Sequence, residues 1–329
     1  MFLYRDILKN SLKITWDNKY LWFFGFFAAL LGSGGEYEII GRGLNGETSS
    51  SLFPGMRRIV ETGIFSSNTF TNIGKLFQND PVSTIILLVI GLIILVLIGF
   101  LMWLTIVSQV ALVNNSAGII TNKKKEFKDG VISGMKYFWR VLGLNIVIRI
   151  IILSAFTLIG LPLVFMASKT GWQTVNVIYI ILFIIFIPIA VSLSFIMKYA
   201  ICYVVIKGNS FIDSIKNSWQ LFIGNWLISI EMAFTLFFIN FIAGLGIILA
   251  ILIITIPFLF LAFLLYKFIA LAGFWIMAGI GIILLLFIVM AGGAALSVFQ
   301  TVSWTNLYIK LSSKGGISKI IRMVDKWNK

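Results

Sequence analysis

The chain has 329 residues, of which 60% are hydrophobic and only 12% charged, and its formal net charge is +14. A soluble protein is about half apolar and about a quarter charged, because polar residues must cover its core. This composition therefore excludes an ordinary soluble fold and predicts a membrane protein. The chain has no His and one Cys, Cys202, which excludes His-ligated metal sites, an intrachain disulfide and Cys-cluster metal sites. The chain has no G-x-x-x-x-G-K-[ST] motif and no G-x-G-x-x-G between a strand and a helix, and we expect neither a cofactor nor an enzymatic activity.

Apolar segments long enough to cross a membrane recur along the chain. A bilayer core about 30 Å thick needs roughly 20 apolar residues in a helix. The predicted fold class is an all-α polytopic membrane bundle with six spans, at about 20–35, 82–107, 141–166, 175–200, 226–254 and 270–303. Small residues follow the short first span, so a cleaved signal peptide is its alternative, but the long amphipathic segment before it favours a span. The stretch from Asn225 to Asn306 has room for more than two passes, and Pro257 and Lys267 mark the expected break.

Lys and Arg gather on alternate connections between these spans. Cytoplasmic loops are enriched in both residues, and anionic lipid attracts them. Most of the 26 basic residues lie before the first span, within 114–140, at Lys207 and Lys216, and from Lys310 onward. Both termini are therefore predicted to be cytoplasmic, in a multi-pass protein of the cytoplasmic membrane. The expected partners are membrane lipids, with anionic inner-leaflet lipid at the basic segments, and not nucleic acid.

An internal repeat precedes the spans. Five residues of the first copy recur at an offset of 207: Asp6, Lys9, Asn10, Ser11 and Asn18 correspond to Asp213, Lys216, Asn217, Ser218 and Asn225. A middle copy at an offset of 123 keeps Asp129 and places Trp139 at the position of Trp16. Because each copy starts on the cytoplasmic side, an even number of crossings must separate the copies. The sequence therefore predicts three parallel hairpins, and not the inverted repeat of many transporters.

These hairpins form a single membrane domain over 1–329. The predicted repeats cover about 1–113, 114–206 and 207–310, with an external loop at about 36–80 and a basic amphipathic tail at 311–329. We expect this tail to lie on the inner leaflet.

Each copy has the pattern of an amphipathic helix. The predicted apolar faces are Leu3, Ile7, Leu8, Leu12, Thr15 and Trp16 in the first copy, Phe127, Val131, Met135, Phe138 and Trp139 in the second, and Phe211, Ile215, Trp219 and Phe222 in the third. Such a helix lies flat among the lipid headgroups with its apolar face buried in the membrane. Asn18 and Asn225 tolerate the backbone that ends a helix and redirects the chain. The alternative is that the copies are the cytoplasmic starts of long transmembrane helices.

Three charged residues fall inside predicted spans. Charged residues within a membrane face the bundle interior and pair with one another. Arg149 and Glu231 lie in nearly the same layer of the repeat, so we expect them to pair, with Lys198 as a competing partner for Glu231. This pair either fixes how two hairpins pack or contacts a substrate or ion. Asn145, Asn240, Gln109 and Thr157 are candidates to extend the network.

The segment from Cys202 to Trp219, CYVVIKGNSFIDSIKNSW, resembles a superfamily of poorly characterised prokaryotic integral membrane proteins and the membrane domain of glycerophosphodiester phosphodiesterases. There, a span ends in a short turn, and a helix of the type Ala/Ser-hydrophobic-basic-x-Ser-Trp precedes an Asn or Gly and the next span. Asn115-Ser116 begins a second instance, and the resemblance covers about 120–310. It implies a six-pass bundle. The phosphodiesterase activity resides in a separate barrel with acidic and His residues, and it does not carry over to a chain without His.

These observations predict a non-enzymatic integral protein that acts in membrane or envelope homeostasis through lipid contacts or an unidentified membrane protein partner. The alternative is a small-solute transporter or channel that uses the layer of Arg149 and Glu231. A membrane enzyme ranks last. Transport predicts a hydrated central cavity that reaches this layer, whereas a scaffold predicts a packed centre.

Overall fold

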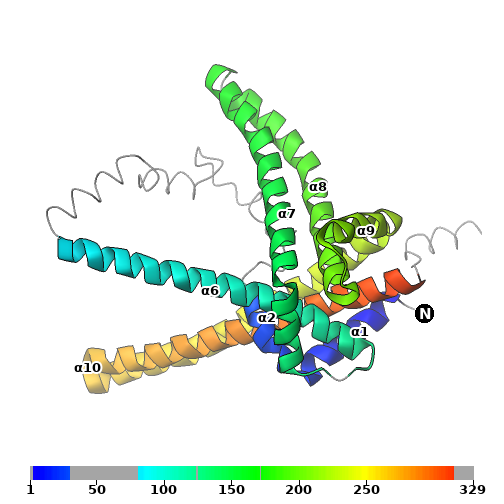
Figure 1. Ribbon diagram of the computed structural model, residues 1–329. Coiled ribbons are helices and arrows are strands. Elements are labelled where there is room, and N and C mark those ends of the chain that lie inside the picture. The colour runs from blue at the N-terminus through cyan, green and yellow to red at the C-terminus, as the bar shows by residue number, and fades with distance from the viewer. Residues whose placement is uncertain (1–2, 30–80, 124, 171, 315–329) are drawn as a thin grey trace, which may run out of the picture. The chain divides into compact units, whose positions relative to one another are not determined.

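The computed structural model describes residues 3–29, 81–123, 125–170 and 172–314, and every regular element among them is an α-helix (Figure 1). The all-helical expectation is therefore confirmed for this part of the chain. The loop predicted at 36–80 and most of the tail predicted at 311–329 lie outside the described residues.

Seven helices follow one another in the described residues. They are α1 (Leu3–Asp17), α2 (Leu21–Ala29), α6 (Pro81–Ile120), α7 (Phe127–Thr170), α8 (Trp172–Lys207), α9 (Phe211–Gly224) and α10 (Trp226–Lys314). Their ends have local causes: Asn122 and Gly208 have left-handed backbones (φ 59° and 73°) after α6 and α8, and the Ser210 hydroxyl accepts from the N–H of Asp213 at the start of α9.

Five stretches of these helices are long and apolar enough to cross a membrane. They are Thr84–Ile120, Phe127–Ser154, Ile184–Lys207, Trp226–Phe268 and Ala270–Ser313. Each overlaps one of the predicted spans from the second to the sixth. Of the first predicted span, the structure describes only α2 and the residue before it, so a sixth crossing stays a prediction.

The last helix, α10, is a hairpin. Its two halves run antiparallel, because the Cβ positions of Gly273, Gly281 and Gly292 lie against Leu265, Phe258 and Ile247 in that order. The reversal is at Ala270, whose φ is 53°. Lys267 correctly marked this region, but Pro257 was the wrong marker, because the helix continues through it. A proline in a transmembrane helix is tolerated when neighbouring groups satisfy the freed carbonyl.

The second repeat copy differs from the predicted interfacial helix. α7 continues from Phe127 to Thr170 without a break, which is the alternative of one long helix. The first and third copies are separate short helices, α1 and α9, each followed at once by the next helix. The difference has a local cause: Asn18 and Asn225 stand at the junctions of the first and third copies, whereas Val141 occupies the corresponding place in α7.

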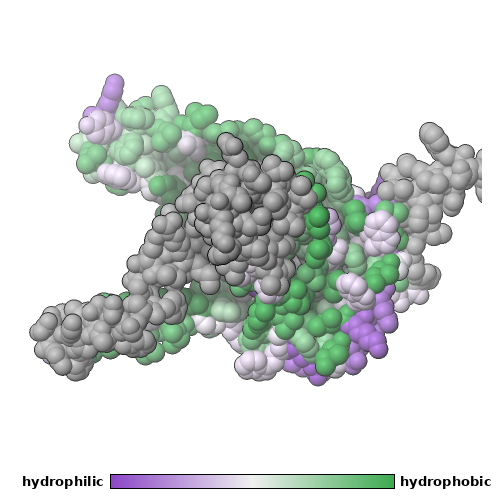
Figure 2. Space-filling model, turned by 90° about the horizontal axis from the view of Figure 1, so that it is seen from above, coloured by the Kyte–Doolittle hydropathy of each residue, from purple (hydrophilic) through white to green (hydrophobic). Residues whose placement is uncertain are grey.

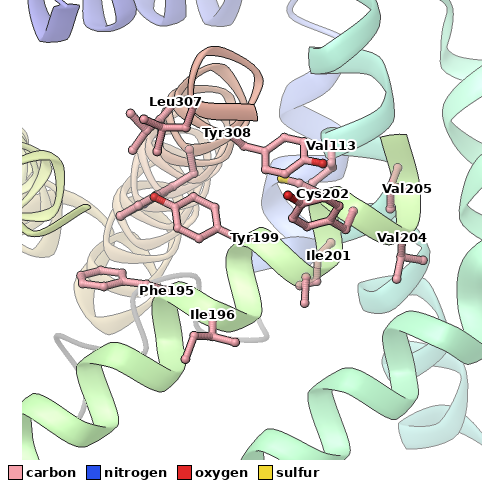
Figure 3. Packing of buried hydrophobic residues seen from close by; sticks show 14 of the residues in the cluster. Val113, Phe195, Ile196, Tyr199, Ile201, Cys202, Val204, Val205, Leu307 and Tyr308 are labelled. Carbon is pink, nitrogen blue, oxygen red and sulfur yellow. The ribbon is translucent and has the colours of Figure 1, made fainter. Parts of the chain in front are cut away.

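The contacts divide the chain into two compact units. The first, here called the packed unit, comprises residues 1–35, 105–148 and 191–329, and the second comprises 36–104 and 149–190. The packed unit contains a core to which α1, α6, α7, α8, α9 and α10 all contribute. Figure 3 shows part of this core, with side chains of α8 such as Phe195 and Tyr199 beside Leu307 and Tyr308 of α10. It therefore joins the beginning, the middle and the end of the sequence.

Glycines allow α7 to pack directly on α6 within the packed unit. A Cβ atom at Gly134 would lie 2.5 Å from Cγ1 and 2.8 Å from the carbonyl oxygen of Val107. One turn earlier, a Cβ atom at Gly130 would lie 3.0 Å from Cβ of Ala111. Small residues four apart let two membrane helices approach closely, which gains van der Waals contact.

Outside the core, the long helices expose their apolar side chains. Nearly all large apolar residues of α6 between Val82 and Met102 are exposed, as are many of α10 between Phe234 and Met290. Figure 2 shows hydrophobic side chains over much of the visible described surface, with hydrophilic ones gathered mainly in one patch. Apolar surfaces of this size are stable only when lipid or another protein covers them.

Candidate functional site

The charged residues predicted inside the membrane belong to both units. Glu231 and Lys198 lie in the packed unit and are half-buried, whereas Arg149 belongs to the other unit and is exposed. The pairing of Arg149 with Glu231 would join the two units and stays a prediction.

The carboxylate of Glu231 accepts a hydrogen bond from the hydroxyl of Tyr4. This bond joins the first turn of α1 to the second turn of α10, across 227 positions of sequence. Hydrogen bonds to an ionised carboxylate are about twice as strong as neutral ones. The sequence analysis missed Tyr4. Its signal was its position one turn before Leu8 and close to Ile7, on the side of α1 that packs on α10.

The ammonium of Lys198 faces aromatic rings. Its Nζ lies 4.5 Å from the ring centre of Trp304 and 6.0 Å from that of Phe195. The negative face of an aromatic ring attracts a cation, most strongly for Trp. Lys198 therefore places its charge against α10 within a candidate span.

An aromatic ladder surrounds this contact. Phe195, Tyr199 and Tyr203 repeat every four residues on α8 and contact Trp304 and Tyr308 of α10, with ring centres 5.0–6.4 Å apart. The hydroxyls of Tyr199 and Ser229 are 2.7 Å apart and hydrogen-bonded. Because Ser229 and Trp304 belong to opposite ends of α10, the ladder holds both ends of this hairpin against α8.

Three of the other polar candidates, Asn145, Gln109 and Thr157, take part in hydrogen bonds. Asn145 donates to Oε1 of Gln109 at 3.0 Å and to the carbonyl of Val141 at 2.9 Å, which joins α7 to α6. Thr157 donates to the carbonyl of Leu153 in its own helix. The amide of Asn240 has no hydrogen-bond partner in the described part of the chain.

Some residues of the predicted repeat have similar local contacts or burial. The amide of Asn18 donates to the carbonyl of Ile14, and that of Asn225 donates to the carbonyl of Leu221, both at 3.0 Å. Ser11 and Ser218 are fully buried, and Gly134 stands at their position in the second copy and is also buried.

The acidic members of the repeat lie at helix starts. Asp6, Asp129 and Asp213 are in the first turns of their helices. Asp129 accepts from the N–H of Glu126 at 3.0 Å. A carboxylate near a helix N-terminus is stabilised by the helix dipole. Asn10 is exposed and Asn217 half-buried.

Two further equivalent positions expose large apolar side chains in all three copies. Leu12, Met135 and Trp219 share one position, and Trp16, Trp139 and Ile223 share the other, one turn later. All six side chains are 51–79% exposed. We call them the exposed apolar positions. Basic residues stand beside them in each copy, including Lys13, Lys136 and Lys216.

The predicted apolar faces are therefore wrong in part. Ile7 and Thr15 were expected to face lipid with Leu12 and Trp16, but they are buried inside the protein. Phe222 is buried as well, whereas Trp219 is exposed. The reason is that these helices carry two neighbouring apolar stripes, and the stripe that includes the small Ser11 and Ser218 packs on the protein.

Within the described residues, no group of three or more His, Cys, Asp or Glu side chains is placed to hold a metal ion. The chain matches no protein-family model, no curated protein and no solved structure. The resemblance to the superfamily of prokaryotic membrane proteins therefore stays an expectation.

Proposed function

We propose that this chain is a non-enzymatic protein of the cytoplasmic membrane that acts in membrane or envelope homeostasis, through contacts of its packed unit with one lipid leaflet. The observation that carries the proposal is the set of exposed apolar positions. Three segments far apart in sequence present large apolar side chains at the same two places, next to lysines. Apolar residues that flank basic ones are typical of helices at the boundary between headgroups and acyl chains.

The proposed arrangement is six spans in three parallel hairpins, with α1, the start of α7 and α9 at the inner leaflet. The shared bond of Asn18 and Asn225 and the buried small residues at the position of Ser11 support a common ancestry of the copies. The positions of the lysines support the cytoplasmic side for all three copies.

Spin labels test the leaflet contact. In a Cys202→Ala background, Leu12→Cys, Met135→Cys and Trp219→Cys each receive a nitroxide in proteoliposomes. We expect all three labels to collide more often with oxygen than with a polar nickel chelate, at depths of about 5–10 Å below the headgroups. Lys9→Cys and Lys216→Cys are the controls, because these exposed lysines belong to the same helices. Labels that are equally open to nickel at the apolar and the control positions would reject the proposal.

A second candidate is transport of a small solute. It is favoured by Glu231 and Lys198, two charged side chains within candidate spans, and by the buried amide of Asn240. Such residues mark substrate or ion pathways in many membrane proteins. Proteoliposomes loaded with ions, amino acids and sugars should then show a flux that Glu231→Gln abolishes. Absence of flux across this panel would remove the candidate.

A further inference from the structure

The connection between α8 and α9 is fixed against α7. Nη1 of Arg140 donates to the carbonyl of Gly208 at 3.1 Å and to that of Asn209 at 3.4 Å. A Cβ atom at Gly208, whose φ is 73°, would lie 3.8 Å from the hydroxyl oxygen of Tyr137. The turn and one face of α7 therefore form a single corner of the packed unit.

Three exposed cations surround this corner. Nζ of Lys136 and Cζ of Arg140 lie 5.3 and 5.9 Å from the ring centre of Tyr137. Nζ of Lys207 lies 5.0 Å from the ring centre of Tyr203, directly before the turn. None of the three forms an ion pair with a carboxylate of the described residues. The nearest acidic residue in sequence, Asp213, instead accepts the hydroxyl of Ser210.

Two large apolar side chains close to these cations in sequence are exposed. Trp139 is 79% exposed and Ile212 is 74% exposed, and they lie beside Arg140 on α7 and in the first turn of α9. A ligand that contacts both the cations and the apolar side chains must carry a negative headgroup next to acyl chains. Free phosphate would contact only the cations. An amphiphilic lipid would contact the cations with its headgroup and the exposed tryptophan and isoleucine with its acyl chains.

We propose that Lys136, Arg140 and Lys207 bind the phosphate headgroup of an anionic phospholipid, with its acyl chains against Trp139 and Ile212. The inference rests on the proposed function, because it requires the corner to lie at the leaflet surface. Arg140 is suited to hold both elements: one nitrogen binds the turn, and the guanidinium retains further donors for phosphate.

Binding of a short-chain lipid tests the site. The full-length protein in a neutral detergent is titrated with dioctanoyl phosphatidylglycerol, with dioctanoyl phosphatidylcholine and with inorganic phosphate, and the thermal shift is recorded. We expect saturable stabilisation by phosphatidylglycerol alone. The double variant Lys136→Gln/Lys207→Gln should bind it at least about tenfold more weakly, because each lysine near an anionic surface contributes several-fold to affinity.

Two control variants distinguish binding at this site from nonspecific attraction to the protein's net positive charge. Lys9→Gln/Lys13→Gln removes the same charge from α1 and should bind within about twofold of the parent. Lys136→Arg/Lys207→Arg keeps the charges and should retain binding, which also shows that the corner folds when both lysines are replaced.

Three results would overturn the site: equal stabilisation by both lipids, equal weakening in the α1 control, or equal stabilisation by inorganic phosphate. If the spin labels lie within the lipid but phosphatidylglycerol is not preferred, the headgroup site alone fails. If the labels are open to water, the proposed leaflet contact fails.

Discussion

Asn18 and Asn225 make the same hydrogen bond at the ends of two short helices that lie 207 positions apart. Each amide donates to the carbonyl four residues earlier, at 3.0 Å, and each residue is followed directly or within three residues by the next helix. The backbone N–H of Asn18 donates to the same carbonyl of Ile14, whereas the backbone N–H of Asn225 donates to the carbonyl of Phe222. The side chains of the two residues thus make the same bond at the ends of α1 and α9.

Replacing either asparagine should destabilise the protein by a similar amount. We expect Asn18→Ala and Asn225→Ala each to cost about 1 kcal/mol, the usual net value of a hydrogen bond. Thermal unfolding in detergent measures the effect, and Asn10→Ala, at an exposed repeat position, is the control with little change. A loss at only one of the two sites would contradict their equivalence.

Gly134 should not tolerate a side chain. Gly134→Ala places a methyl group 2.5 Å from a side-chain atom and 2.8 Å from a backbone oxygen of Val107, so α6 and α7 must separate. Overpacking of this kind costs about 1–3 kcal/mol.

The matched control for this change is Gly91→Ala. No atom lies within 4 Å of a Cβ at Gly91, and alanine favours helix by about 0.5–1 kcal/mol. Unfolding temperatures of the two variants should therefore move in opposite directions. An equal shift in both would show that the close contact of α7 with α6 is not what limits stability.

The bond between Tyr4 and Glu231 should couple the first helix to the last. Tyr4→Phe and Glu231→Gln are each expected to destabilise the protein, and the double variant should lose less than their sum, with a coupling of about 1 kcal/mol. Thermal unfolding of the four proteins completes the cycle. Additive losses would show that the hydrogen bond contributes nothing.

A second double-mutant cycle tests the predicted pairing of Glu231 with Arg149. If Arg149 pairs with Glu231, Glu231→Gln leaves a charge without its partner and lowers folding and expression, and Arg149→Gln restores them in part. Membrane yield and thermal unfolding report both effects. Parental yield and stability of Glu231→Gln would remove the pairing.

Chemical labelling of introduced cysteines tests the orientation of the chain in the membrane. In a Cys202→Ala background, an impermeant maleimide should label Ser50→Cys, in the loop predicted to be external, in intact cells. It should reach Lys216→Cys on α9 only after the membrane is permeabilised. Labelling of Lys216→Cys in intact cells would reverse the topology and place all three repeat copies on the outer side.

The sequence predicted the elements of the fold better than their contacts. Apolar length alone located the spans of α6, α7, α8 and α10, because crossing a membrane demands a run of apolar residues. Lys267 predicted the region of the turn in α10 but not its position at Ala270, because alanine is not typical of turns. Pro257 misled because neighbouring groups within a membrane bundle can accommodate a proline.

The candidate site was harder to predict for two physical reasons. No local sequence pattern indicates the contact of Tyr4 with Glu231, because 227 positions separate the two residues. The lipid-facing sides of α1 and α9 were predicted from the helical spacing of apolar residues, but each helix has two apolar stripes with that spacing. Only packing decides that Ile7 turns inward while Leu12 remains outside.

The packing of α1 and α2 against α10 has a consequence for biogenesis. Tyr4 of α1 is translated 227 residues before its partner Glu231 on α10. Until α10 has been translated, α1 and α2 lack the part of their packing surface that this helix supplies. Completion of the α10 hairpin is thus the step that closes the contacts of α1 and α2, and a chain truncated before α10 is expected to be a target for membrane proteases.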